Sequence, residues 1–238
     1  MTDARRITLE GRPVEYVVRE SDRATRAKIQ VGVAGVSVVI PSGVDADPEG
    51  LLRANAEWVR ERDAEYEATR ARVPDRTFAA GARFPYLGGE REVAVEQRSR
   101  SVVTDEAFVL ARWEVERTSV KNALESLYRR LAREHFESRL DHYADAMDVT
   151  YDAVHVRNQR TRWGSCSTSG TISLNWRLLL APPRIADYVV VHELAHVIEP
   201  NHSERFWRVV GAHDPDYAVH REWLADNGVT LVFDESDL

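Results

Sequence analysis

The chain has 238 residues, 43% of them hydrophobic and 30% charged, with 32 basic and 39 acidic side chains and a net charge of −7. These values are typical of a globular protein with one large domain or two modest ones, and they argue against extended disorder. The acidic balance disfavours a protein that mainly coats nucleic acid, because phosphate binding needs a positively charged surface.

The first half of the chain is predicted to be rich in β-strands. β-Branched residues between glycine or polar breaks predict strands over residues 14–19, 28–31 and 36–40. Asp47 and Pro48 begin a helix that extends to about Val73, because proline suits the first helical position. Further strands are predicted over 84–87, 92–95 and 102–110. We find no internal repeat.

The second half is predicted to be helical, with a small sheet. Apolar residues at helical spacing predict a long helix over 120–147. Strands are then predicted over 154–156 and 171–174, and helices over 184–198, 204–210 and 217–225. The acidic residues 234–237 are expected to form a frayed tail. This order predicts an α+β fold, with a β-rich region containing one helix over 1–116 and a helix-rich domain over 117–238.

The cysteine content and the N-terminus bear on the cellular compartment. Cys166 is the single cysteine, which excludes an intrachain disulfide. The first twelve residues lack the apolar core of a signal peptide, and the apolar stretches are shorter than the roughly 20 residues that span a bilayer. We therefore expect a soluble, cytoplasmic protein that does not bind a membrane.

Two histidines of the helix over 184–198 have the spacing of metal ligands. His192 and His196 are four residues apart, so their side chains lie on one helix face, close enough to share an ion. Glu193 follows His192, where its carboxylate can reach a water on that ion without being a ligand. This HExxH spacing is that of zinc hydrolases, whose catalytic zinc has three protein ligands and one open position.

The third ligand is predicted to be His202. The chain turns back at Pro200 and Asn201, and Asn201 with Glu204 has the spacing of a capping box that would place His202 in the first turn of the next helix. Less favoured alternatives are Glu199, His213 and Glu222. Cys166 as a fourth ligand would close the site and make it structural, so we favour a packing role for it. Four histidines without metal spacing are interpreted as structural or surface residues: His135, His142, His155 and His220.

Several segments together carry a resemblance to a known family. They are RWGSCS at 162–167, TISLNWRL at 171–178, DYVVVHELAH at 187–196, PNHS at 200–203 and, more loosely, FPYLG at 84–88. Together they resemble the YgjP-type metallopeptidases, which are compact zincins related to the SprT peptidases. The resemblance is almost continuous over residues 158–209.

This resemblance implies a fold, a metal and a reaction. It implies a zincin-like metallopeptidase domain over 117–238 with a small sheet beside the HExxH helix. His192, His196 and His202 would bind Zn²⁺, and Glu193 would act as general base while a zinc-activated water hydrolyses a peptide bond of a protein or peptide substrate. Metzincins share the spacing but need a methionine downstream of the site, whereas Met1 and Met147 both lie upstream.

The sequence leaves the supporting residues open. Arg162 either orients a substrate carbonyl or pairs with an acid, and Tyr188 either donates to the transition-state oxyanion or packs in the core. The strand predicted near residues 171–176 is either the sheet edge that receives a peptide as an added strand or an ordinary core strand.

Two other functions compete with the peptidase. A family of metal-dependent endoribonucleases shares the three-histidine spacing but lacks the glutamate after the first histidine, so Glu193 and the net charge argue against it. The second is a structural-zinc adaptor module that docks on DNA. Its patch would be formed by Arg157, Arg160, Arg162 and Arg177. Nucleic-acid binding is thus conceivable but unsupported by the net charge.

Overall fold

The computed structural model describes residues 4–234 and 237. Contacts between residues divide the chain into two compact units, the first ending at Pro74 and the second beginning at Asp75. Within the described residues, the helices are too short or too polar to cross a membrane.

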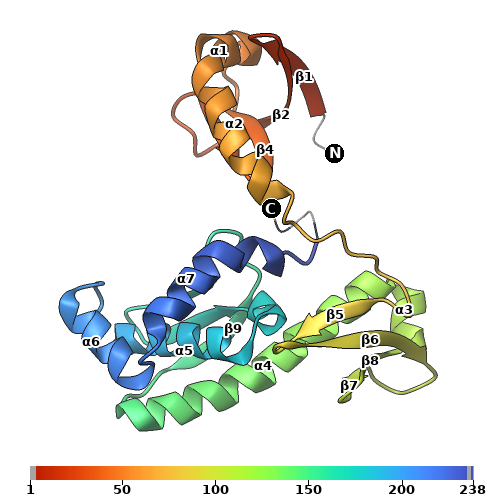
Figure 1. Ribbon diagram of the computed structural model, residues 1–238, viewed down its shortest axis with the longest axis vertical. Helices are drawn as coiled ribbons and strands as arrows, with labels where there is room; N and C mark the ends of the chain where they lie inside the picture. Colours follow the sequence, from red (N-terminus) through yellow and green to blue (C-terminus); the bar gives the residue numbers. More distant parts are fainter. Residues whose placement is uncertain (1–3, 235–236, 238) are drawn as a thin grey trace. The chain divides into compact units, whose positions relative to one another are not determined.

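The first unit is a four-stranded sheet packed against two helices (Figure 1). Its strands, in spatial order, are β1 (Ala4–Leu9), β2 (Arg12–Ser21), β4 (Gly35–Pro41) and β3 (Lys28–Gly32). Leu52 of α1 (Pro48–Ala54) and Val59 of α2 (Ala56–Arg70) are buried in the same core as the sheet. The predicted single helix is therefore two helices, because the backbone of Asn55 leaves the helical conformation between them.

The second unit begins with another four-stranded sheet. Its strands, in spatial order, are β5 (Arg83–Tyr86), β6 (Gly89–Glu96), β8 (Ala107–Ala111) and β7 (Val102–Val103). The predicted strand over 102–110 is interrupted by a turn, in which the Thr104 hydroxyl accepts the N–H groups of Glu106 and Ala107. Both four-stranded sheets have the same strand order and directions, and two helices follow each of them. The expectation of no internal repeat is thus corrected at the level of topology.

A long helix, α4 (Val120–Met147), joins the parts of the second unit (Figure 1). It has the predicted bounds, begins where the Ser119 hydroxyl accepts the N–H of Asn122, and ends at Asp148 in the left-handed conformation. A short helix that the sequence pattern did not indicate, α3 (Arg112–Arg117), precedes it.

The core of the second unit explains where the contacts divide the chain. Phe84, Val93 and Phe108 of the β5–β8 sheet are buried in one cluster with the apolar face of α4. The division therefore lies at 74/75, whereas the sequence pattern places a domain boundary at 116/117. That residues 117–238 form the peptidase domain stays a prediction.

The third sheet lies beside the predicted ligand helix. Its strands, in spatial order, are β10 (Gly164–Cys166), β11 (Thr171–Asn175) and β9 (Ala153–Arg157). β10 lies between two predicted strands, where the sequence pattern predicted no strand, and β11 is the central strand and not an edge. The 3-10 helix η1 (Trp176–Leu180) leads into three helices, α5 (Pro183–Ile198), α6 (Glu204–His213) and α7 (Tyr217–Asn227), followed by the 3-10 helix η2 (Gly228–Leu231). The α+β class is confirmed.

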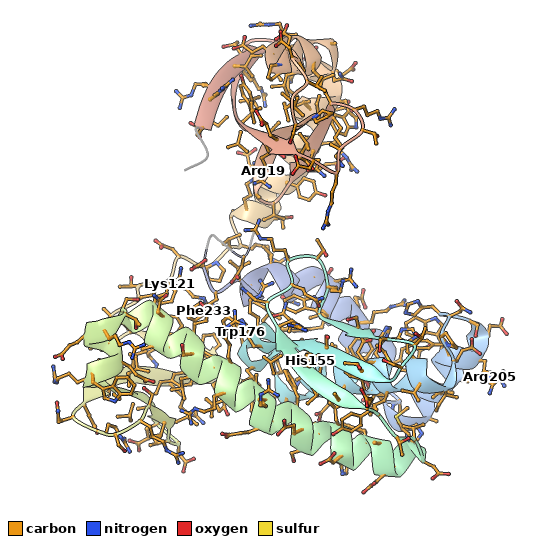
Figure 2. All side chains as sticks on the ribbon, turned by 180° about the vertical axis from the view of Figure 1, so that it is seen from behind. Arg19, Lys121, His155, Trp176, Arg205 and Phe233 are labelled. Carbon is orange, nitrogen blue, oxygen red and sulfur yellow. The ribbon has the colours of Figure 1, made fainter. Side chains whose placement is uncertain are left out.

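The C-terminal segment differs from its prediction. Phe233 is buried, and its ring lies 5.0 Å from the ring of Trp176 (both labelled in Figure 2). Asp237 is also buried, and its carboxylate accepts hydrogen bonds from the Asn158 side chain and the Phe233 N–H. The tail is therefore not frayed at these positions; residues 235–236 of the predicted tail lie outside the described residues.

Candidate metal centre

Helix α5 positions the first two histidines rigidly. Pro183 lies in its first turn, where the missing N–H costs no hydrogen bond. Most of its residues are buried in the core of the second unit. The helix ends at Ile198, followed by the extended Glu199 and by Pro200, so the chain turns shortly after His196.

The turn brings the third histidine to the other two. One ring nitrogen from each of His192, His196 and His202 lies within 4.8 Å of the others. The Nε2 atoms of His192 and His202 are 3.1 Å apart, close to the roughly 3.3 Å between two nitrogens bound tetrahedrally to zinc. Ser203, not Asn201, caps the next helix by accepting the N–H of Phe206, so the capping prediction is wrong and His202 immediately precedes the cap.

Two aromatic residues of α6 hold the cluster. The fully buried ring of Phe206 lies 4.5–4.9 Å from all three imidazoles. Trp207 stacks on the exposed His202 with ring centroids 5.7 Å apart, and Tyr217 stacks on Trp207 at 5.3 Å. The neighbouring rings therefore restrict the orientation of the one ligand that lies outside α5.

Burial keeps the helical imidazoles neutral, as metal ligands must be. Desolvation, with smaller contributions from His196 and His202, lowers the pKa of His192 to about 3, and desolvation also lowers the pKa of His196. The Nδ1 of His196 lies 3.3 Å from the backbone oxygen of Glu199, which leaves Nε2 for an ion. Three imidazoles with converging nitrogens fit a divalent metal such as zinc.

The side chain of Glu193 packs on the edge strand β10 and not on α6, which contacts the three histidines. Its carboxylate is buried and accepts a hydrogen bond from the backbone N–H of Cys166. A Cβ atom on Gly164 would lie only 2.4 Å from Glu193 Oε1, so the glycine allows the carboxylate to pack directly on the strand. Burial raises the pKa of Glu193 to about 8, while the charge of Arg162 acts in the opposite direction.

Tyr188 lies one helical turn before His192, and their ring centroids are 5.8 Å apart. Burial raises the pKa of its hydroxyl to about 12, so the phenol stays protonated. Behind it, the buried His220 pairs with Asp214 at 2.9 Å, and the His220 ring centroid lies 6.4 Å from that of Tyr188. The sequence pattern did not connect His220 with this region.

The structure separates the other candidates from the histidine cluster. In the described part of the chain, that cluster does not include Glu199, His213, Glu222 or Cys166. Cys166 instead directs its thiol to the Ser167 carbonyl oxygen. Arg177, predicted as part of a basic patch, is only 3% exposed, so it contributes no surface to a DNA-binding patch.

Sequence reasoning missed three contributors to this site: Gly164, Phe206 and Trp207. Gly164 was within a quoted motif, but its packing on Glu193 depends on residues that are far apart in sequence. Phe206 and Trp207 lie shortly after His202 and carry no polar chemistry that would mark them.

Comparisons with known proteins concern the family and not the site geometry. A family model for the YgjP-like metallopeptidase domain matches residues 25–227. The crystal structure of the metallopeptidase zymogen of Pyrococcus abyssi abylysin is 26% identical, covering 41% of this chain and 99% of that chain, with a TM-score of 0.36. A comparison with curated proteins gives no match. Because the family model spans most of the chain, the protein belongs to the YgjP-like metallopeptidase family.

Proposed function

We propose that this protein is a zinc-dependent peptidase in which His192, His196 and His202 hold the metal and Glu193 is the general base. The convergence of three imidazoles, with a buried glutamate beside the first, carries this proposal. It makes the family's metallopeptidase assignment specific in metal, residues and reaction. The helix α5 beside the small β9–β11 sheet supports a zincin-like description of this region.

The donor set favours zinc over harder cations. Imidazole nitrogens suit zinc, whereas magnesium and calcium prefer oxygen ligands. A bound zinc ion supplies Lewis-acid chemistry, polarising the substrate carbonyl and making water more acidic. The cluster offers three protein ligands, which is the number in catalytic zinc sites.

Glu193 is suited to move a proton twice. Its carboxylate takes a proton from the attacking water and then delivers it to the leaving amine nitrogen. The Cys166 N–H and the close packing on Gly164 hold the carboxylate in one place, so the proton acceptor is positioned before substrate binds. Tyr188 remains a protonated donor that we propose to stabilise the oxyanion.

The edge strand β10 is the proposed docking site for a peptide backbone. The Asn175 N–H donates to the Trp163 carbonyl and the Ser167 N–H donates to the Thr171 carbonyl. In this antiparallel register, the backbone groups of Gly164 and Cys166 therefore point away from β11, toward the edge at which the Cys166 N–H donates to Glu193. A peptide strand added there would lie beside Glu193.

Two variants test this function. Glu193→Gln is expected to keep zinc and lose peptide hydrolysis, whereas His202→Ala is expected to lose both. His155→Gln is the matched control, because His155 is exposed on β9 (Figure 2) and lies outside the cluster. Metal analysis and assays with casein and with structured RNA measure the outcome. Zinc retained by His202→Ala would overturn the ligand assignment, and cleavage of RNA alone would overturn the reaction.

A further inference from the structure

The segment that builds the sheet beside the metal centre carries a distinct charge. Residues 153–186 contain five arginines and no aspartate or glutamate, in a chain that has 39 acidic residues and a net charge of −7. This segment includes β9, β10, β11 and the beginning of α5. The most cationic part of this acidic protein therefore adjoins the proposed reaction centre.

Four of the five arginines are exposed, and Arg177 is buried. Arg184, in the first turn of α5, lies apart in sequence from the other three. Arg157, Arg160 and Arg162, which we call the loop arginines, are exposed at the end of β9 and in the loop before β10. Across residues 4–234 and 237, no carboxylate forms a salt bridge with any of them.

Buried donors fix the loop that carries these side chains. Loop 158–163 crosses the C-terminal end of β11, where Asn175 donates from Nδ2 to the backbone oxygen atoms of Gln159 at 2.7 Å and of Arg162 at 3.4 Å. Arg177 adds a hydrogen bond of 2.9 Å to the same Gln159 oxygen. Because Asn175 and Arg177 are both buried, the backbone of the loop is held from beneath and its arginines face solvent.

The loop leads directly into the reaction centre. Gly164, which packs on the Glu193 carboxylate, is two residues after Arg162. Two residues of extended chain span about 7 Å at most. Arg162 is thus within the reach of a substrate residue adjacent to the scissile bond.

We propose that the loop arginines bind a carboxylate of the peptide substrate close to the scissile bond, and that the enzyme therefore prefers acidic peptides. This inference rests on the proposed peptidase function. A guanidinium group binds a carboxylate through two parallel hydrogen bonds, so the pair has a defined geometry in addition to its electrostatic attraction. Among the described residues, Glu193 forms no salt bridge with the loop arginines, and its buried carboxylate is bonded to the Cys166 N–H.

A peptide carboxylate explains the loop better than nucleic acid does. Three exposed cations form a small footprint, and the net charge of −7 repels a phosphate backbone elsewhere on the surface. The burial of Arg177 removes the fourth arginine of the predicted patch. The position of Arg162 next to the general base indicates recognition of one substrate residue and not of an extended polyanion.

The proposal is tested by measuring how peptides bind to the full-length protein without metal. The metal is left out because a peptide carboxylate can also bind zinc directly. Four fluorescent hexapeptides are used, with Asp or Asn at the centre and either a free carboxylate or an amide at the C-terminus. Comparing them distinguishes binding of a side-chain carboxylate from binding of the terminal carboxylate. Wild type is expected to bind the preferred carboxylate about tenfold more tightly than its neutral counterpart. Arg162→Gln is expected to remove this preference, and Arg184→Gln, with the same charge change outside the loop, to keep it.

Three binding results would overturn the proposal: equal affinity of wild type for all four peptides, an equal loss of preference in Arg184→Gln, or tighter binding of a single-stranded oligonucleotide of matched charge. Hydrolysis by the zinc-loaded protein is measured with the same peptides. A carboxylate preference without hydrolysis would refute the proposed function and leave the carboxylate site standing. Hydrolysis without a preference would refute the carboxylate site and support the proposed function.

Discussion

The contact between Gly164 and Glu193 allows a sharp test of how the proposed general base is positioned. In Gly164→Ala, the new Cβ would lie 2.4 Å from Oε1, 2.7 Å from Cγ and 2.8 Å from Cδ of Glu193. Ordinary contacts of a Cβ atom begin at 3.4 Å, so the carboxylate or the strand must move by about 1 Å. The glutamate is buried, so the shift must also disturb its bond to the Cys166 N–H.

This displacement is expected to slow turnover much more than it changes the metal site. A misplacement of about 1 Å in a reacting group costs about 100-fold in rate, or about 2.7 kcal/mol in the activation barrier. The three atoms nearest to the new Cβ all belong to Glu193, so the substitution acts first on this side chain, and zinc content should remain that of the wild type. The overpacking is expected to lower the free energy of unfolding by about 1–3 kcal/mol.

The assay compares kcat, zinc content and urea unfolding for wild type, Gly164→Ala and Ser165→Ala. Ser165 is the neighbouring residue of β10, and its side chain lies on the opposite face of the strand. Ser165→Ala is therefore expected to behave as wild type. A folded, zinc-loaded Gly164→Ala with unchanged kcat would show that the position of Glu193 against β10 does not determine turnover.

Three further predictions concern the metal and the core. Trp207→Leu removes the ring stacked on His202 and should weaken zinc affinity at least about tenfold in a chelator competition, with Trp207→Phe closer to wild type; equal affinities in all three proteins would contradict this. Phe233→Ala leaves a cavity beside Trp176 and should cost about 3–5 kcal/mol in urea unfolding, whereas Val219→Ala, at a 63% exposed site, should cost under about 0.5 kcal/mol. Removing zinc held at 100 times its Kd should lower the unfolding free energy by about 2.7 kcal/mol in wild type and much less in His202→Ala; equal losses would contradict the ligand set.

The parts of the site that could be predicted are those with local signals. Helical periodicity identified α4 and α5, and the spacing of His192, His196 and His202 needs only one helix face and one turn of chain. The turn itself was predicted, but its capping residue was not. Asn201 and Ser203 are both residue types that cap helices well, and the conformation of the backbone determines that Ser203 is the cap.

The parts that could not be predicted depend on contacts between distant segments. β10 has the residues Gly, Ser and Cys, which have little intrinsic preference for strands, and it is a strand because it pairs with β11. The tail has an acidic composition typical of frayed ends, yet Phe233 packs on Trp176 and Asp237 receives the Asn158 amide. Such burial follows from tertiary partners that the local composition does not contain.

The two neighbouring residues His192 and Glu193 divide the site into two parts. Successive residues of a helix point about 100° apart, so His192 faces Phe206 of α6 while Glu193 faces Gly164 of β10. In the proposed function, the α6 side determines metal affinity, and the sheet side, with its loop arginines, determines proton transfer and the choice of substrate. Changes at Trp207 and Gly164 should for this reason have separate effects, the first on zinc affinity and the second on turnover at full zinc occupancy. A change of Gly164 that released the metal would show that the two faces of α5 are coupled.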